Sequence, residues 1–191
     1  LGPCQSADTI LEVNIPGDLP LNMTETFSLV ASSTNFPEYR QALDIRLKLP
    51  GHILLVDDDR WYDQAPTFKE ALTTAGFDFD FWENGTNSLG RGSPQLDLLN
   101  AYDFVLWYTG LDWFRPITAQ ESQDLLAYAQ QGGRLFLTSQ DYLYYHASDP
   151  LTRDYLGVLQ YVESVTPTIA YGGSPPSPLA DLAGPLPLEY G

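Results

Sequence analysis

The chain has 191 residues, 43% hydrophobic and 13% aromatic, a composition that supports a globular domain with a buried core. It carries 25 acidic and 9 basic residues, a formal net charge of −16, which repels the phosphates of nucleic acids and of anionic membranes. No apolar run reaches the roughly 18–20 residues that a membrane-spanning helix needs.

The amino-terminal region, residues 1–50, reads as β-rich. Residues 9–15, 24–31 and 41–49 alternate polar and apolar side chains, as half-buried strands do. Three strands do not close a sandwich core alone. We therefore expect either the end of an immunoglobulin-like sandwich or strands that pack on the next domain, with the boundary at Pro50-Gly51 and a second domain over 51–191.

The second region begins with a strand and a helix. Residues 53–56 form a continuous apolar run, typical of a strand covered on both faces. Pro66 fits the first turn of a helix that Gly76 can end. The next segment, 77–81, alternates Phe and Asp strictly, which predicts a sheet-edge strand with one wet face.

The remainder continues the alternation of helices and strands. A short helix after Ser93-Pro94 precedes an apolar strand over 104–108. Thr118 and Glu121 have the spacing of a capping box, and their helix should stop at Gly132-Gly133 before a strand over 135–137. The last expected elements are a helix from Asp149-Pro150 to Leu156, a fifth strand over 158–165 and a loop over 166–191.

This order predicts an α/β fold with a parallel sheet and right-handed crossovers. The second strand has the polarity of an edge strand, whereas the first, third and fourth have that of central strands. Strand order 2-1-3-4-5 satisfies this pattern. It is the order of a flavodoxin-like three-layer sandwich.

In such sheets, ligands bind beyond the carboxyl ends of the strands. Asp57, Asp58 and Asp59 follow the first strand, and their mutual repulsion requires a cation or hydrogen-bond donors to offset it. Oxygen ligands suit Mg²⁺ or Ca²⁺, so these three carboxylates are the candidate metal site. The alternative is structural: one Asp caps the loop, one pairs with Arg60 and one is solvated.

Aromatic and polar residues at the same edge are candidates for ligand binding. Trp61 follows the first strand, and aromatic side chains beside carboxylates can stack on sugars or on peptide side chains. The alternative is packing within the loops. The expected peptide- or carbohydrate-contacting residues are Trp61, Asp112, Trp113, Gln140 and Asp141.

Nucleophilic catalysis has one candidate pair of residues. The single cysteine, Cys4, lies far away in sequence, on the β-rich segment, and excludes an internal disulfide or a multi-thiolate metal site. Ser139 follows the fourth strand, and His146, one or two helical turns later, is the histidine that could act as its base. More often such a histidine is a packing residue on a helix.

Several segments in order carry a resemblance: "ILLVDDD", "AGFDFDFWE", "LNAYDFVLWYTG", "ITAQESQDLLAYAQQGGRLFLTSQDY", "DYLGV" and "LAGPLPLEY". The series resembles the flavodoxin-like, class I glutamine amidotransferase-like domains of secreted multidomain bacterial proteins and covers roughly residues 52–188. Such domains often accompany extracellular peptidase domains. The catalytic Cys of amidotransferases is not matched, since its position falls near Ser139 or Gln140, and the resemblance therefore implies the fold without the activity.

The low lysine content and the twelve tyrosines favour an exported, extracellular or cell-surface protein. The chain starts without methionine and ends after a proline-rich stretch, so we expect both ends to be cut from a longer protein. The expected function is a non-catalytic accessory domain, for binding or spacing, beside neighbouring domains of a larger protein. Ca²⁺ or Mg²⁺ is its candidate cofactor. The alternative is a hydrolase using Ser139 and His146, or metal-activated water at Asp57–Asp59.

Overall fold

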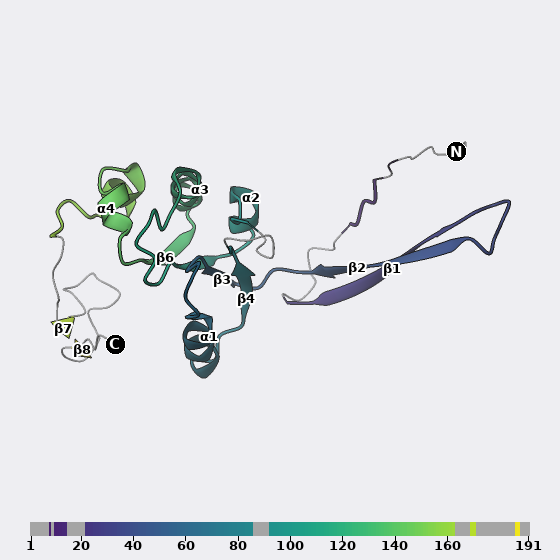
Figure 1. Cartoon of the computed structure of the whole chain (residues 1–191), viewed down its shortest axis with the longest axis horizontal. Helices are drawn as coiled ribbons and strands as arrows, with labels where there is room; N and C mark the ends of the chain where they lie inside the picture. Colours follow the sequence, from purple (N-terminus) through teal and green to yellow (C-terminus); the bar gives the residue numbers. More distant parts are fainter. Residues whose placement is uncertain are drawn as a thin grey trace. The chain divides into compact units, whose positions relative to one another are not determined.

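The computed structural model describes residues 8, 10–14, 22–85, 92–162, 169–170 and 186–187 (Figure 1). Cys4 lies outside this set. The chain divides into two compact units, Leu1–Tyr142 and Leu143–Gly191. The boundary that we expected at Pro50-Gly51 falls inside the first unit and stays a prediction.

The first unit begins with an antiparallel hairpin of β1 (Thr24–Ser32) and β2 (Arg40–Lys48). Its register pairs Phe27 with Ile45 and Leu29 with Leu43, so one face of the hairpin is apolar. Of the third strand expected here, over residues 9–15, the described residues 10–14 form no strand. Within the described part, β1 and β2 pair only with each other.

A parallel sheet of four strands follows: β3 (Ile53–Asp57), β4 (Phe79–Glu83), β5 (Phe104–Tyr108) and β6 (Arg134–Thr138). The strands are ordered β4-β3-β5-β6, with β3 and β5 in the centre. The chain is therefore α/β with a parallel sheet, as the alternation of strands and helices predicts.

Three helices cover the two faces of this sheet (Figure 1). One face carries α1 (Ala65–Thr74); the other carries α2 (Leu96–Leu99) and α3 (Ala119–Gln130). The capping box expected at Thr118 and Glu121 is formed at the start of α3 and is confirmed. Gly76 ends the α1 segment with a φ of 77°, a left-handed conformation that favours glycine.

The core is aromatic on the α1 face of the sheet. Leu55, Leu106 and Tyr108 are buried there, and Phe68 and Leu72 of α1 pack against them. The rings of Phe68 and Tyr108 are stacked, with centroids 4.1 Å apart. Burial of these side chains fixes α1 on the sheet.

On the other face of the sheet, close packing requires a glycine in the turn between α3 and β6. Tyr128 is buried, and its hydroxyl donates a hydrogen bond to the Tyr102 carbonyl at 3.1 Å. A Cβ atom on Gly133 would lie 2.3 Å from a ring atom of Tyr128. The turn that brings the chain from α3 into β6 therefore has no room for a side chain at this position.

One residue of the edge strand β4, Asp80, is less exposed than the sequence predicts. Asp80 was expected on a wet face, yet it is half-buried and ion-paired with Lys48. Its Oδ2 atom also accepts hydrogen bonds from the Gly51 amide at 2.9 Å and the Tyr102 hydroxyl at 3.2 Å. Asp80 thus ties the segment that enters β3 to the sheet.

The second unit contains short elements. After α4 (Tyr142–His146), Pro150 leads into a five-residue π-helix, η1 (Leu151–Tyr155), in place of the expected α-helix. Residues 158–162 of the expected fifth strand form no strand, and 163–165 lie outside the described residues. In the expected loop, β7 (Ile169–Ala170) and β8 (Leu186–Pro187) pair antiparallel. The five-stranded flavodoxin-like order therefore stays a prediction.

Candidate functional site

The carboxyl ends of the parallel strands meet at one edge of the sheet, where Asp57 ends β3 and Asp58 and Asp59 follow it. Asp57 lies beside Tyr108 in register, and Tyr108 beside Thr138. The pairing continues past β3, because the Asp58 amide donates to the Tyr108 carbonyl at 3.0 Å. Asp57, Asp58 and Asp59 are only 4–6% exposed, so their carboxylates lie inside the edge and not on its surface.

Asp58 belongs to a buried hydrogen-bond network. Asn84 Nδ2 donates to Asp58 Oδ1 at 2.7 Å, and Trp107 Nε1 donates to Asp58 Oδ2 at 3.1 Å. Burial and, to a smaller extent, the negative charge of Glu121 raise the pKa of Asp58 to about 8, against the opposing effect of the two donors. The Asp58 carboxyl is therefore mostly protonated at neutral pH.

Asn84 bridges two acids. Its Nδ2 also donates to Glu121 Oε1 at 2.9 Å, while Glu121 Oε2 accepts from the Thr118 amide at 2.6 Å. Glu121 thus closes the capping box of α3 and contacts the aspartate edge at the same time. From the sequence, Glu121 is predicted only as a helix cap, and Asn84 is not among the predicted site residues. The detectable signal for Asn84 is its place directly after β4, one residue past the strand end.

Asp59 and Asp57 form a loop-closing turn. Asp59 Oδ2 accepts from the Gln64 amide at 3.0 Å just before α1, and Asp57 Oδ1 accepts from the Asp59 amide at 3.2 Å. Burial raises the pKa of Asp59 to about 6, partly offset by the Gln64 amide. Burial, together with the charge of Asp57, also raises the pKa of Tyr108.

The aspartates are thus used largely by the protein itself. Asp59 closes the loop, as the structural alternative predicts, but none of the three is solvated and Arg60 forms its ion pair with Asp112 instead. Among the residues described, no group of three His, Cys, Asp or Glu side chains is placed to hold a metal ion. The Mg²⁺ or Ca²⁺ site at Asp57–Asp59 stays a prediction that this hydrogen bonding does not favour.

Arg60 clamps the loop after β3 to the loop after β5. Its Nε forms an ion pair with Asp112 Oδ2, and Asp112 is fully buried. Its Nη2 donates to the Phe114 carbonyl at 2.7 Å and to the Arg115 carbonyl at 2.5 Å. Arg60 and Arg115 have φ values of 53° and 48°, unusual for residues with side chains. Asp112 is therefore the buried partner of Arg60, and its expected contact with a ligand stays a prediction.

The two clamped loops expose large apolar side chains, which we call the aromatic rim. Trp61 is 59% exposed and Trp113 is 60% exposed. The ring centroids of Trp113 and Phe114 are 5.9 Å apart in an edge-to-face contact, and the Arg60 guanidinium lies 5.3 Å from the centroid of Trp61. The rim comprises Trp61, Tyr62, Leu111, Trp113 and Phe114.

The remaining predicted site residues come after β6. Thr109 Oγ1 donates to Ser139 Oγ at 2.7 Å, Gln140 is exposed and Asp141 is half-buried. His146 Nδ1 lies 2.7 Å from Asp149 Oδ2. Ser139 belongs to the first unit and His146 to the second, so their pairing stays a prediction.

Comparison of the chain with protein-family models, curated proteins and solved structures finds no match. Within the described ranges, no helix combines the length and the apolar character needed to cross a membrane.

Proposed function

We propose that the chain is a non-catalytic binding domain of a larger exported bacterial protein and that it docks a basic protein surface through the aromatic rim. The observation that carries this proposal is the Arg60 clamp. It links two loops from adjacent strands through the buried Asp112 and through two backbone carbonyls. Trp61 and Trp113, on the linked loops, are each more than half exposed.

The physical argument is preorganisation. Exposed tryptophans are frequent anchors of protein interfaces, and loops held in place before binding lose less conformational entropy on association. Arg60 and Arg115 have positive φ values, a strained backbone conformation for residues with side chains. Residues strained in this way occur most often at functional sites. Leu111 and Phe114 extend the apolar surface, which favours a protein partner over a sugar.

Charge favours a basic partner, because a chain of net charge −16 attracts cationic surfaces and repels anionic ones. The carboxyl groups of Asp58 and Asp59 fit a non-catalytic role, because their oxygens already accept hydrogen bonds within the protein. The donors are Asn84, Trp107 and Gln64. We extend the proposal to a flavodoxin-like, amidotransferase-like domain without the catalytic cysteine, beside a peptidase domain of the same protein. The resemblance of residues 52–188 supports that extension.

The test is selection of peptides from a displayed random library against the whole chain. Peptides rich in Arg, Lys and aromatic residues should be enriched. Trp61→Ala and Trp113→Ala should each weaken the selected peptides by about 2 kcal/mol, roughly thirtyfold in Kd, in calorimetric titration.

The matched control is Tyr39→Ala, which removes an aromatic side chain that is 71% exposed near the hairpin turn. It should leave the affinity unchanged. Equal affinities for the two tryptophan variants and the Tyr39 variant would refute the rim as the binding surface. Binding to an oligosaccharide array with no peptide enriched would refute the protein partner.

A further inference from the structure

One face of the parallel sheet carries α1, and among the described residues of the first unit the side chains on this face become more exposed toward β6. In register, Leu55 of β3 lies beside Leu106 of β5, and Leu106 lies beside Phe136 of β6, so the three side chains share a face. Leu55 is fully buried under α1, whereas Phe136 is 46% exposed. The part of this face over β5 and β6, which we call the exposed strip, is therefore apolar and partly exposed.

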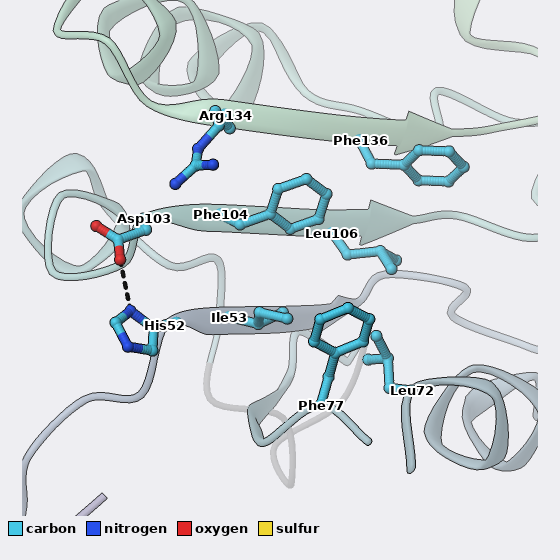
Figure 2. Close-up of a pocket in the computed structure, with 9 residues that line it drawn as sticks. All are labelled: His52, Ile53, Leu72, Phe77, Asp103, Phe104, Leu106, Arg134 and Phe136. Atoms are coloured by element: carbon cyan, nitrogen blue, oxygen red, sulfur yellow. Dashed lines mark hydrogen bonds and ion pairs between the residues drawn. The ribbon is translucent and has the colours of Figure 1, made fainter. Parts of the chain in front are cut away.

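A pocket of about 650 Å³ occupies this strip. This volume is in the usual range for small-molecule sites, roughly 300–1,000 Å³. Figure 2 shows its aromatic side chains on the same side of the strands, with Leu72 of α1 beside them. Its apolar walls are formed by Ile53, Leu72, Phe77, Phe104, Leu106 and Phe136.

Three polar side chains lie together at one end of the pocket, where the strands begin (Figure 2). His52 precedes β3, Asp103 precedes β5 and Arg134 begins β6, so the parallel register brings them to the same edge. His52 Nδ1 lies 2.5 Å from Asp103 Oδ2. In the described part of the chain, the guanidinium of Arg134 has no ion pair or side-chain hydrogen bond.

We propose that this pocket binds a small amphipathic carboxylate, with its apolar body against Phe104 and Phe136 and its carboxylate on Arg134. The ligand should be anionic, because Asp103 is paired with His52, whereas the guanidinium of Arg134, with its five N–H donors, has no ion-pair partner among the described residues. A carboxylate matches the planar guanidinium through two parallel hydrogen bonds. This site is at the opposite end of the strands from the aromatic rim and is independent of the proposed docking function.

The test is calorimetric titration of the whole chain with naphthalene-2-carboxylate and with its neutral amide, naphthalene-2-carboxamide. The carboxylate should bind about tenfold more tightly, because a hydrogen bond to a charged group adds to the shared apolar contact. Arg134→Gln should remove this preference and leave the affinity for the amide unchanged. Phe136→Glu should weaken both probes by at least about tenfold.

Two control variants change exposed residues elsewhere: Arg153→Gln in η1 and Phe36→Glu before β2. Both should bind the two probes as the wild type does. Failure of the wild type to bind either probe overturns the pocket, and equal affinities for acid and amide overturn the role of Arg134. A wild-type dimer in light scattering that Phe136→Glu dissociates would show that a second copy covers this face, which also overturns the proposal.

Discussion

Asp58→Asn should change how the stability of the protein depends on pH. Burial raises the pKa of Asp58 from 3.8 to about 8, so between these values the folded chain retains a proton that the unfolded chain has released. The free energy of unfolding therefore falls as the pH rises through this window, by up to about 1.4 kcal/mol per pH unit. Across the window the loss is roughly 6 kcal/mol, comparable to the total stability of many domains.

The Asn side chain has nearly the same shape and does not ionise, so the variant should lose this part of the pH dependence. At pH 5 it should be slightly less stable than the wild type, because its amide N–H₂ then faces the N–H donor of Asn84 or Trp107. At pH 8.5 the order should reverse, with the variant more stable by roughly 3 kcal/mol.

The assay is urea unfolding at several pH values from 5 to 9, followed by tryptophan fluorescence. Asp78→Asn is the matched control, since it removes an exposed carboxyl between α1 and β4 and the same unit of net charge. If Asp58→Asn and Asp78→Asn show the same dependence on pH as the wild type, Asp58 does not hold a proton in the folded state and the reasoning is wrong.

Three further predictions concern packing, the clamp and cations. Gly133→Ala should lower the free energy of unfolding by roughly 2 kcal/mol, because its Cβ would overlap the buried ring of Tyr128; urea unfolding measures this, and an unchanged midpoint would contradict the close packing. Arg60→Gln should cost roughly 3 kcal/mol in the same assay, since it leaves the buried Asp112 without its cation, whereas Arg153→Gln should cost nothing measurable. Millimolar Ca²⁺ or Mg²⁺ should move Tm by less than about 1 °C, because Asp57–Asp59 are hydrogen-bonded within the protein; a larger, saturable rise would establish the metal site instead.

Sequence patterns predict the elements whose formation depends on residues that are close together in the chain. The capping box at Thr118 and Glu121 needs two residues three apart, and it is present. The apolar run at 53–56 predicts a strand with helices on both faces, and β3 has that position. The segment 10–14 alternates as a strand does but pairs with no strand in the described part of the chain, and alternation alone does not provide a partner.

The candidate site depends on contacts between distant residues, which sequence patterns do not show. Asn84 meets Asp58 across 26 positions and Glu121 across 37 positions. The order of strands and loops predicts that the segments after β3 and β5 lie together, and the Arg60–Asp112 ion pair joins them. That ion pair itself is not predicted, because neither the positive φ of Arg60 nor the burial of Asp112 has a signal in the sequence.

The bridge made by Asn84 has a consequence for how the protein can be produced. Asn84-Gly85-Thr86 matches the acceptor pattern for N-linked glycans, yet the side chain is only 6% exposed and its nitrogen donates to two carboxyl groups. A sugar attached during synthesis in a eukaryotic secretory pathway would occupy that nitrogen before the chain folds. The Asp58–Asn84–Glu121 bridge would then not close, so recombinant material should be made in a host that does not glycosylate this tripeptide.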